Sequence, residues 1–379
     1  MMPISQASPP LWASAAADLA VLPPEFGAAV VFIFGAVIGS LLNVCVYRMP
    51  RGESIVAPRS HCPNCNALIP WYQNIPLFSY IALRGRAACC GTFFSIRYWV
   101  VELATAIGFL LIWLSFPWNV ALCLMLFFAL MLIATCTDLE HYIIPNEITW
   151  GSAAAGLVCS FLVPALQHET SRFKAFGLSL AGAIIAYLVL WGIVEMGKIL
   201  FGRRKVRFEK PEEVTIDSKG ISVPGETMVW EDIFSRETDR LCLEGENVSA
   251  GEKTWARAEI AVTHDSIQIG EETFPLAEFG SLKATTSELV IPREAMGFGD
   301  VKLLTGIGAF LGPGALFFVV MVSSMLGAIV GLILLALKRR DWGGKLPYGP
   351  YLAFAAMLWI FFGRDLVAWY RALFVGSPE

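Results

Sequence analysis

Charged residues are scarce in this chain of 379 residues. Only 16% of its residues are Asp, Glu, Lys or Arg, whereas 56% are hydrophobic. Soluble domains carry about 25% charged residues, so this composition excludes an ordinary soluble protein and indicates a membrane protein. Residues 1–26 contain no Lys or Arg, and the apolar run after them is long enough to cross a bilayer. We therefore expect no secretory signal peptide, but a short extracytoplasmic N-terminus over 1–26.

The cysteines do not form the regular set of a disulfide-rich protein, and basic residues are not in excess. Nine cysteines are scattered along the chain, which excludes the disulfide framework of a small secreted protein. Four of them cluster between 62 and 90, and the others lie mostly in apolar runs, where a thiol is a small hydrophobe. The formal net charge is −4. We expect the lipid bilayer as the surroundings of this protein and no nucleic acid as a partner.

The apolar stretches predict the fold class, an all-α polytopic membrane protein with about eight transmembrane helices. About 20 residues are needed to cross the hydrocarbon core, so the sixth stretch is short and is expected to pack inside the bundle or to begin below the membrane surface. The stretches lie at roughly 27–47, 98–116, 119–137, 146–166, 174–201, 300–312, 314–338 and 348–373.

Basic residues predict the orientation of these helices. Arg48, Arg51, Arg59, Arg84, Arg86 and Arg97 lie in the loop 48–97, Arg203 to Lys205 follow the fifth helix, and Lys338 to Arg340 follow the seventh. All three groups fall on one side when eight spans alternate from an outside N-terminus. Basic loops lie on the cytoplasmic side, so the loop 48–97, which carries the cysteines, is expected there.

Residues 203–292 differ in composition from the rest of the chain. They hold 18 acidic against 11 basic residues, and they show short alternating runs of β-branched residues between turn signals. The pattern Thr-x-Asp-Ser occurs at Thr215 and again at Thr263, which suggests a duplicated unit of about 48 residues. We predict a small β-rich cytoplasmic domain inserted between helices two to five, within 98–202, and the last three helices, within 293–379.

Asp138 ends a very apolar run at the predicted cytoplasmic boundary, in the stretch Thr137-Asp138-Leu139-Glu140-His141. One interpretation is a helix-terminal carboxylate that is hydrated by the loop or paired with His141. The other is a functional carboxylate, because charges at this depth are costly.

Asp300 follows two glycines in the stretch Gly297-Phe298-Gly299-Asp300-Val301-Lys302. Asp300 could simply cap the sixth helix. The glycines Gly297 and Gly299 would also let an extended peptide approach closely, and Lys302 is either an interface charge or part of the site.

The predicted topology brings both aspartates to one face of the membrane. Two neighbouring carboxylates do not both ionise easily, so such a pair holds one proton near neutral pH. One carboxylate could then activate a water molecule while the other protonates the substrate.

Four groups of motifs in this chain resemble those of the type IV prepilin peptidases, a family within the wider group of GxGD-type intramembrane aspartyl proteases. The order and the spacing of the motifs along the chain match the family as well. The resemblance implies that Asp138 and Asp300 are the catalytic pair and that cleavage occurs at the cytoplasmic face. Many members also N-methylate the new terminus with S-adenosylmethionine. The motifs are Gly39-Ser-Leu-Leu-Asn43-Val with Tyr47-Arg-Met-Pro50; Cys62-Pro-Asn-Cys65 with Trp71-Tyr-Gln-Asn-Ile-Pro-Leu-Phe-Ser-Tyr80, Arg97-Tyr98 and Glu102; Asp138 with Ile144-Pro145; and Gly297 to Lys302 with Leu346-Pro-Tyr-Gly-Pro-Tyr351.

The cysteine cluster is a candidate metal site. Cys62 and Cys65 form one CxxC pair, and a second pair would complete a four-cysteine zinc site. The family often has Arg-Gly-x-Cys-x-x-Cys-Gly here, but Ala87 stands where the third ligand would be, Cys89 is displaced by two positions, and Cys90 matches the last ligand. We expect either a structural Zn²⁺ on these cysteines, with His61 or water as a substitute ligand, or a reduced cysteine loop. The same departure leaves the methyltransferase activity, and hence S-adenosylmethionine, an open question.

Glu102 lies near the start of the second apolar helix. An intramembrane carboxylate suggests function, so we expect Glu102 to support the active site, with simple pairing to Arg97 as the alternative.

These features together predict a multi-pass enzyme of the bacterial cytoplasmic (inner) membrane, an aspartic endopeptidase that cleaves prepilin or pseudopilin precursors. One alternative is a general GxGD protease of other signal segments. Another is a non-catalytic membrane scaffold or a transporter with a proton-coupled aspartate pair. Which precursor is cut, and the oligomeric state, do not follow from the sequence.

Overall fold

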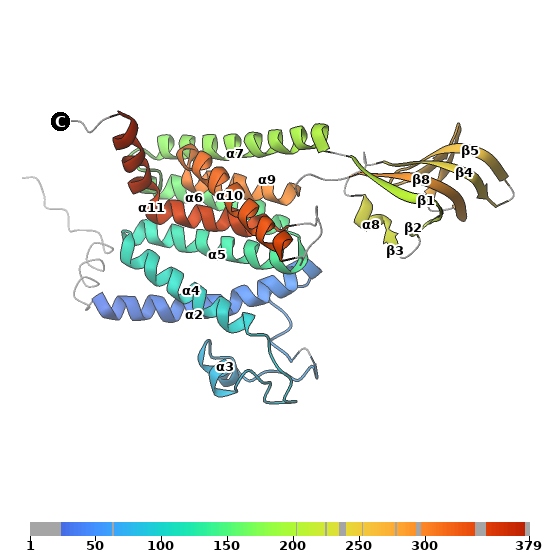
Figure 1. Cartoon of the computed structure of the whole chain (residues 1–379). Helices are drawn as coiled ribbons and strands as arrows, with labels where there is room; N and C mark the ends of the chain where they lie inside the picture. The colour runs from blue at the N-terminus through green and yellow to red at the C-terminus, as the bar shows by residue number, and fades with distance from the viewer. Residues whose placement is uncertain are drawn as a thin grey trace, which may run out of the picture. The chain divides into compact units, whose positions relative to one another are not determined.

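The computed structural model describes residues 24–375 apart from 63, 202, 224–225, 235–239, 252, 277–278, 293–296 and 338–345. The expected N-terminal segment 1–26 and the basic group at Lys338–Arg340 therefore lie largely or wholly outside the described residues. The chain divides into two compact units (Figure 1). One comprises residues 1–189 and 299–379, and the other comprises Leu190–Phe298.

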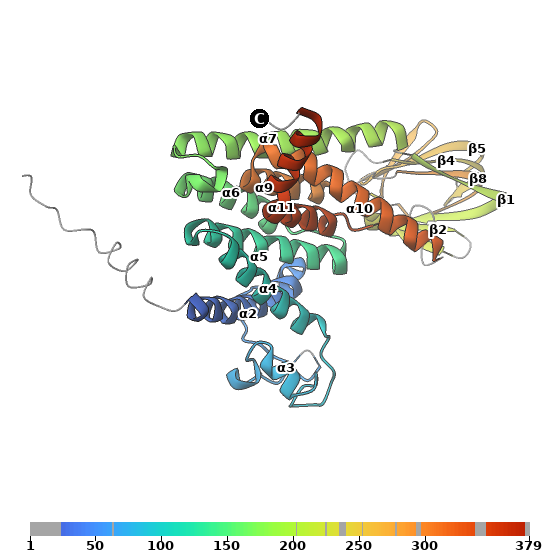
Figure 2. The same ribbon diagram turned by 60° about the vertical axis from the view of Figure 1, so that its left-hand side comes forward.

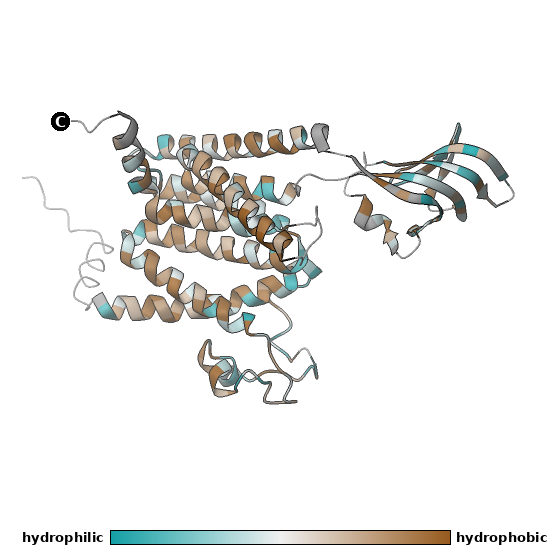
Figure 3. Ribbon diagram, in the orientation of Figure 1, coloured by the Kyte–Doolittle hydropathy of each residue, from teal (hydrophilic) through white to brown (hydrophobic). Residues whose placement is uncertain are grey.

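The first unit is a bundle of helices. Each apolar stretch of the sequence forms one of them, and the ribbon of these helices is coloured as hydrophobic over most of its length (Figure 3). They are α2 (Pro24–Arg48), α4 (Arg97–Ser115), α5 (Trp118–His141), α6 (Asn146–Leu162), α7 (Arg172–Phe201), α9 (Phe298–Leu311), α10 (Leu316–Ala336) and α11 (Gly349–Val375). The end of α7 from Leu190, and the first residue of α9, belong to the second unit.

Five helices in the described part of the chain are long and apolar enough to cross a membrane: α2, α4, α5, α7 and α10. In α11 the apolar helical part, Gly349–Gly363, is shorter than these five. Helices α6, with 17 residues, and α9, with 14, are also shorter. The predicted helices are thus present, and the chain is a multi-pass membrane protein, but length and composition identify five spans among the described residues, not eight.

Helix α9 is short because it lies inside the bundle. At about 1.5 Å per residue it is about 21 Å long, less than the hydrocarbon core. Every residue from Asp300 to Phe310 except Lys302 is buried. An ideal Cβ on Gly156 of α6 would lie 2.7 Å from Ala309, and the Ser179 hydroxyl of α7 donates to the Ala309 carbonyl at 2.6 Å. Helix α9 therefore packs against α6 and α7 (Figure 2), which confirms the first of the two expectations for it.

The loop between α2 and α4 carries little regular structure. It contains the five-residue helix α3 (Phe78–Ala82) and two isolated β-bridges, His61 with Leu68 and Arg86 with Phe93. Each bridge closes one small hairpin, and the four clustered cysteines lie at the tips of these two hairpins.

The second unit is an eight-stranded antiparallel sheet with its own hydrophobic core, as the alternating runs predict. Its order is β3-β2-β1-β8-β4-β5-β6-β7. The strands are β1 (Arg203–Asp217), β2 (Gly220–Val223), β3 (Glu226–Val229), β4 (Leu241–Ala250), β5 (Lys253–Val262), β6 (Ser266–Ile269), β7 (Glu272–Pro275) and β8 (Ser281–Pro292), with the short helix α8 (Trp230–Ile233) after β3.

The order of the sheet is symmetric. If each of β1 to β4 is exchanged with its counterpart among β5 to β8 (β1 with β5, β2 with β6, and so on), the strand order stays the same but is read from the other edge of the sheet. Both Thr-x-Asp-Ser segments stand at equivalent places: Thr215 leads into the turn between β1 and β2, and Thr263 into the turn between β5 and β6. This arrangement is what a duplicated four-strand unit with exchanged last strands would form.

Candidate active site

Asp138 lies in the last turn of α5 and is almost completely buried, with 6% of its surface exposed. The helix ends at His141, and the next residue, Tyr142, caps it in a left-handed conformation with φ 55°, its N–H bonded to the Asp138 carbonyl. The Asp138 Oδ2 accepts the backbone N–H of Gly349 at 2.8 Å. The carboxylate is thus held by the first residue of α11, and no ion pair between Asp138 and His141 is found among the described residues.

Asp300 is the third residue of α9, with 7% of its surface exposed. It is not a helix cap, since the helix begins at Phe298. Its Oδ1 is buried and has no hydrogen-bond partner among the described residues. A buried acceptor without a partner is uncommon in native proteins and indicates a place for a proton donor such as water.

The two aspartates lie on either side of Ile144 and Gly349, where an ideal Cβ on Gly349 would lie 2.8 Å from the Asp138 Oδ2. Ile144 lies at the same place: ideal Cβ atoms on Gly299 and Gly349 would lie 3.5 and 3.1 Å from its side chain. Residues from α5, α9 and α11 and from the turn after α5 therefore converge on one point. Two buried carboxylates in mutual repulsion favour a state in which they share a proton.

The glycines and the lysine near Asp300 have separate places. Gly297 is exposed and precedes α9, and Gly299 is half-buried within its first turn. The Lys302 ammonium donates to the Asn146 Oδ1 at 2.7 Å, which joins the first turns of α9 and α6. Lys302 thus helps to fix the start of the helix that carries Asp300.

Glu102 has a different environment from the one expected. Its Oε2 accepts the Leu77 N–H at 2.7 Å, and the Ser40 hydroxyl is a further hydrogen-bond partner. The alternative of a pair with Arg97 is wrong, because Arg97 forms its ion pair with Glu140. Glu102 therefore faces α2 and the cysteine-bearing loop, and it carries no ion pair among the described residues.

Gly349 is the residue of this site to which the sequence reasoning gave no role. The motif Pro-Tyr-Gly-Pro around it was noted only as part of the resemblance. A Pro after the glycine at the start of a helix is a sign of a fixed N-terminal turn. Such a turn presents free N–H groups that bind carboxylates.

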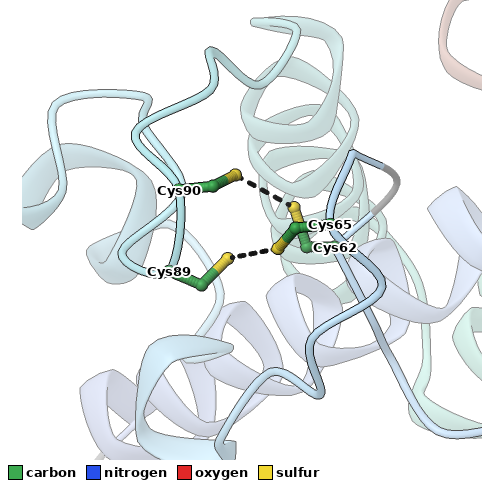
Figure 4. Close-up of side chains that lie close together, drawn as sticks. All are labelled: Cys62, Cys65, Cys89 and Cys90. Atoms are coloured by element: carbon green, nitrogen blue, oxygen red, sulfur yellow. Dashed lines mark hydrogen bonds between the residues drawn. The ribbon is translucent and has the colours of Figure 1, made fainter.

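The four cysteines of the loop meet in space. The sulfur atoms of Cys62, Cys65, Cys89 and Cys90 all lie within 4.8 Å of one another. The Cys62 and Cys90 sulfurs are 3.6 Å apart and those of Cys65 and Cys89 3.3 Å apart, and the side chains point toward one another from two hairpins (Figure 4). Sulfurs bound to one tetrahedral Zn²⁺ at about 2.3 Å would be separated by a similar distance. The cluster fits a metal ion.

The two hairpins have the same backbone hydrogen bonds. Cys62 N–H bonds to Ala67 O and Asn66 N–H to Cys62 O, just as Ala87 N–H bonds to Thr92 O and Gly91 N–H to Ala87 O. Ala87 is thus the counterpart of Cys62, as the family pattern suggests. Cys89 nevertheless reaches the cluster, so the displacement does not remove the fourth sulfur. His61 is not among the described residues whose ligand atoms meet in the cluster, and its Nδ1 lies 3.2 Å from Arg59 O.

The surroundings of the second hairpin favour a thiolate. Hydrogen bonds from Thr92 lower the pKa of Cys90 to about 6, with a further contribution from Asn64. The hydrogen bond with Cys65 raises the pKa of Cys89 to about 12. A cation is the partner that would stabilise the second thiolate, because metal binding requires deprotonated sulfur.

Comparison with known families agrees with this arrangement. Residues 33–116 match the family described as the bacterial peptidase A24 N-terminal domain. Residues 125–203 and 274–332 match the type IV leader peptidase family. The two matched regions contain the cysteine cluster and both aspartates, and residues 204–273 fall outside them. No solved structure matches the chain.

Several curated proteins are similar to this chain, two of those described here over most of their length. The chain is 26% identical to a prepilin leader peptidase/N-methyltransferase of Aeromonas hydrophila over 371 residues, which covers 91% of this chain and 94% of that protein. It is also 26% identical to one of Legionella pneumophila, which covers 92% and 95%. A third, of Myxococcus xanthus, is 37% identical over 171 residues, 44% of this chain and 49% of that protein.

Proposed function

The chain belongs to the type IV leader peptidase family, and on that premise we propose that Asp138 and Asp300 are its catalytic pair. The reaction is hydrolysis of the peptide bond between the leader and the hydrophobic helix of a prepilin or pseudopilin. The observation that carries the proposal is the convergence of two buried carboxylates, on α5 and α9, around Ile144 and Gly349.

The pair acts as a general base and a general acid. The ionised carboxylate takes a proton from a water molecule, whose oxygen then attacks the carbonyl carbon of the scissile bond. The protonated carboxyl group donates to the carbonyl oxygen, and collapse of the tetrahedral intermediate releases the amine with a proton. The two carboxyl groups differ in their hydrogen bonds. The Asp138 Oδ2 accepts the Gly349 N–H, whereas the Asp300 Oδ1 has no partner among the described residues and is free to bind water. This difference supports different roles for the two groups.

Isosteric variants of the two aspartates test this proposal. Asp138→Asn and Asp300→Asn should each abolish the gel shift of a co-expressed prepilin, because neither amide can carry the shared proton. Asp365→Asn is the matched control, since Asp365 is exposed on α11 and should leave cleavage intact. Full cleavage by either variant of the pair would overturn the assignment.

The cytoplasmic side of the inner membrane is the location that the basic residues favour. The loop 48–97 carries six arginines and would lie in the cytoplasm together with the aspartate pair. A fluorescent protein inserted in the exposed turn at Gly251 between β4 and β5 should then fluoresce, since such reporters do not mature when exported unfolded across the membrane. A full-length fusion protein that does not fluoresce would show that this side of the protein faces away from the cytoplasm.

We also propose that this chain methylates the amine that cleavage releases, because its relatives are named prepilin leader peptidase/N-methyltransferase. S-adenosylmethionine would supply the methyl group, and its sulfonium sulfur would keep the electrons of the broken carbon–sulfur bond. The residues of the chain must bind this donor and accept the proton that the amine loses.

Zn²⁺ would be held by Cys62, Cys65, Cys89 and Cys90, where it would join the two hairpins of the loop and thus fix their shape.

A further inference from the structure

The loop between α2 and α4 exposes large apolar side chains within one short stretch, residues 71–83, which we call the apolar segment. It includes the 3₁₀ helix Trp71–Gln73 and helix α3, and it contains no charged residue. Apolar surface that gathers in this way marks a place of contact with a membrane or with another protein. Five of its side chains are between 41% and 74% exposed: Trp71, Tyr72, Ile75, Phe78 and Ile81.

Hydrogen bonds fold the apolar segment into a compact piece of structure. The Ser79 N–H bonds to the Ile75 carbonyl at 3.0 Å, and the Ser79 hydroxyl accepts the Ile75 N–H at 2.9 Å. Phe78 and Ile81 stand three residues apart in α3 and therefore share one face of that helix. The exposed side chains thus belong to a folded surface and not to an extended piece of loop.

A contact with α4 shows how deep this surface lies. The Leu77 N–H donates to the Glu102 Oε2 at 2.7 Å. Helix α4 has 19 residues and is about 28 Å long, so nearly its whole length is needed to cross a hydrocarbon core of about 30 Å. Glu102 stands five residues after Arg97, where α4 begins, which is about 8 Å along the helix. Leu77 is therefore held at the depth of the lipid headgroups and the first acyl carbons, not in the water beyond them.

The charges beside the apolar segment identify the kind of surface that it fits. The loop 48–97 contains six arginines and one acidic residue, Glu53. Arg84 is exposed, stands two residues after α3, and its N–H bonds to the Ile81 carbonyl at 3.1 Å. Apolar and aromatic side chains next to basic ones are the combination with which interfacial segments bind membranes that contain anionic lipids. The excess of positive charge favours such a membrane over an apolar protein surface.

We propose that the apolar segment is an interfacial membrane anchor, with Phe78 and Ile81 among the lipid acyl chains and Arg84 at the phosphate groups of anionic lipids. The leaflet is the one at the proposed active site, because Arg97 at the start of α4 pairs with Glu140, two residues after Asp138. The anchor holds the cysteine-bearing loop against the membrane. The inference rests on the membrane span of α4 and holds whether or not the aspartates cleave a substrate.

Photocrosslinking from position 78 tests the proposal in the full-length protein. Phe78 is replaced by p-benzoylphenylalanine, which reacts with nearby C–H bonds under ultraviolet light, and the protein is placed in nanodiscs of phosphatidylethanolamine and phosphatidylglycerol. Mass spectrometry of the irradiated protein should show the added mass of one phospholipid. The same replacement of Leu114, which is 64% exposed on α4, is the positive control. Replacement of Glu259, exposed on β5 of the sheet unit, is the negative control.

The identity of the captured lipid tests the role of the charge. The ratio of phosphatidylglycerol to phosphatidylethanolamine in the adducts from position 78 should exceed the ratio in the nanodisc. Arg84→Gln in the same protein should lower the ratio in the adducts about two- to fivefold, because one arginine near an anionic surface contributes this much to lipid binding. Arg257→Gln is the matched control, since Arg257 is an exposed arginine of the sheet unit.

Three results would contradict the proposal. A lipid adduct from position 114 but not from position 78 would show that the apolar segment lies outside the membrane. A crosslink from position 78 to a second copy of the chain, or to the sheet unit, would show that this surface is a protein interface. An unchanged lipid ratio in Arg84→Gln would show that Arg84 does not lie at the phosphate groups.

Discussion

At the scale of single residues, the position of Asp138 depends on one backbone N–H. Gly349 supplies it from a helix that begins 211 residues later. An ideal Cβ on Gly349 would lie 2.8 Å from the Asp138 Oδ2 and 3.1 Å from Ile144. Only a glycine lets α11 approach the carboxylate this closely, so Gly349 is a positioning residue for the proposed pair.

Gly349→Ala should therefore reduce the rate of prepilin cleavage by about 10- to 100-fold, because a displacement of about 1 Å at a catalytic group has effects of this size. The rate is measured with purified enzyme and a prepilin in detergent micelles. Gly151→Ala is the control, since a Cβ there would meet nothing within 4 Å. Equal rates for Gly349→Ala and the wild type would show that the contact does not position Asp138.

The cysteine cluster makes a second prediction at this scale. Ala87 and Cys62 occupy equivalent places in two hairpins, and Cys89 supplies the fourth sulfur from another position. Cys89→Ala should lower the zinc content of the purified protein, measured by mass spectrometry. Adding Ala87→Cys to that variant should restore the zinc, because it moves the ligand to the place that matches Cys62. Cys242→Ala in the sheet is the control and should not alter the zinc content, whereas zinc retained in Cys89→Ala would exclude Cys89 as a ligand.

Residue types and motifs predicted which side chains to examine, but not their partners. Asp138 and Asp300 could be singled out because the predicted topology brings both to one face of the membrane and because both match the family motifs. The partners of Glu102 and Arg97 were missed, since either carboxylate near Arg97 could have paired with it and only the packing of α4 against α5 decides for Glu140. Gly349 was missed because a backbone N–H has no signature in a side-chain pattern.

At the scale of elements, the contact between α9 and α7 is made by two glycines. An ideal Cβ on Gly308 would lie 2.4 Å from the Gly182 carbonyl oxygen, and one on Gly182 would lie 2.2 Å from the Gly308 carbonyl oxygen. Backbone atoms on both sides cannot move as a flexible side chain can. The burial of α9, and with it the place of Asp300, depends on this close approach.

Gly308→Ala should lower the stability of the protein by about 1–3 kcal/mol, the usual cost of overpacking. Thermal unfolding in detergent micelles should show a lower midpoint. Gly177→Ala on α7 is the control, because a Cβ there has open space and alanine favours the helix. A midpoint for Gly308→Ala equal to that of the wild type would mean that the two helices can separate freely.

The helices could be predicted from the sequence and their number of spans could not. An apolar run identifies a helix wherever it lies, so all eight positions were correct to within a few residues. Whether a short helix such as α9 spans or is enclosed depends on its neighbours, and the small residues that enclose it are spread over α6, α7 and α9. The strand order likewise required the structure, although the repeated Thr-x-Asp-Ser segments indicated the duplication that it shows.

At the scale of the whole molecule, the chain enters and leaves the sheet at neighbouring points. Arg203 at the start of β1 pairs with Pro292 at the end of β8, and paired Cα atoms lie about 5 Å apart. The unit has its own hydrophobic core, and both proposed catalytic aspartates belong to the other unit. An insertion of this kind can be removed without stretching the chain.

A protein in which 204–291 is replaced by a short Gly-Ser linker should therefore fold and cleave a co-expressed prepilin at a level near that of the wild type. The physical reason is that the bundle keeps every residue of the proposed active site. Asp138→Asn in the shortened protein is the control and should abolish cleavage, which shows that the same pair is at work. If the shortened protein accumulates in the membrane but no longer cleaves, the sheet unit gates the active site or recruits the substrate, and it is not a tolerated insertion.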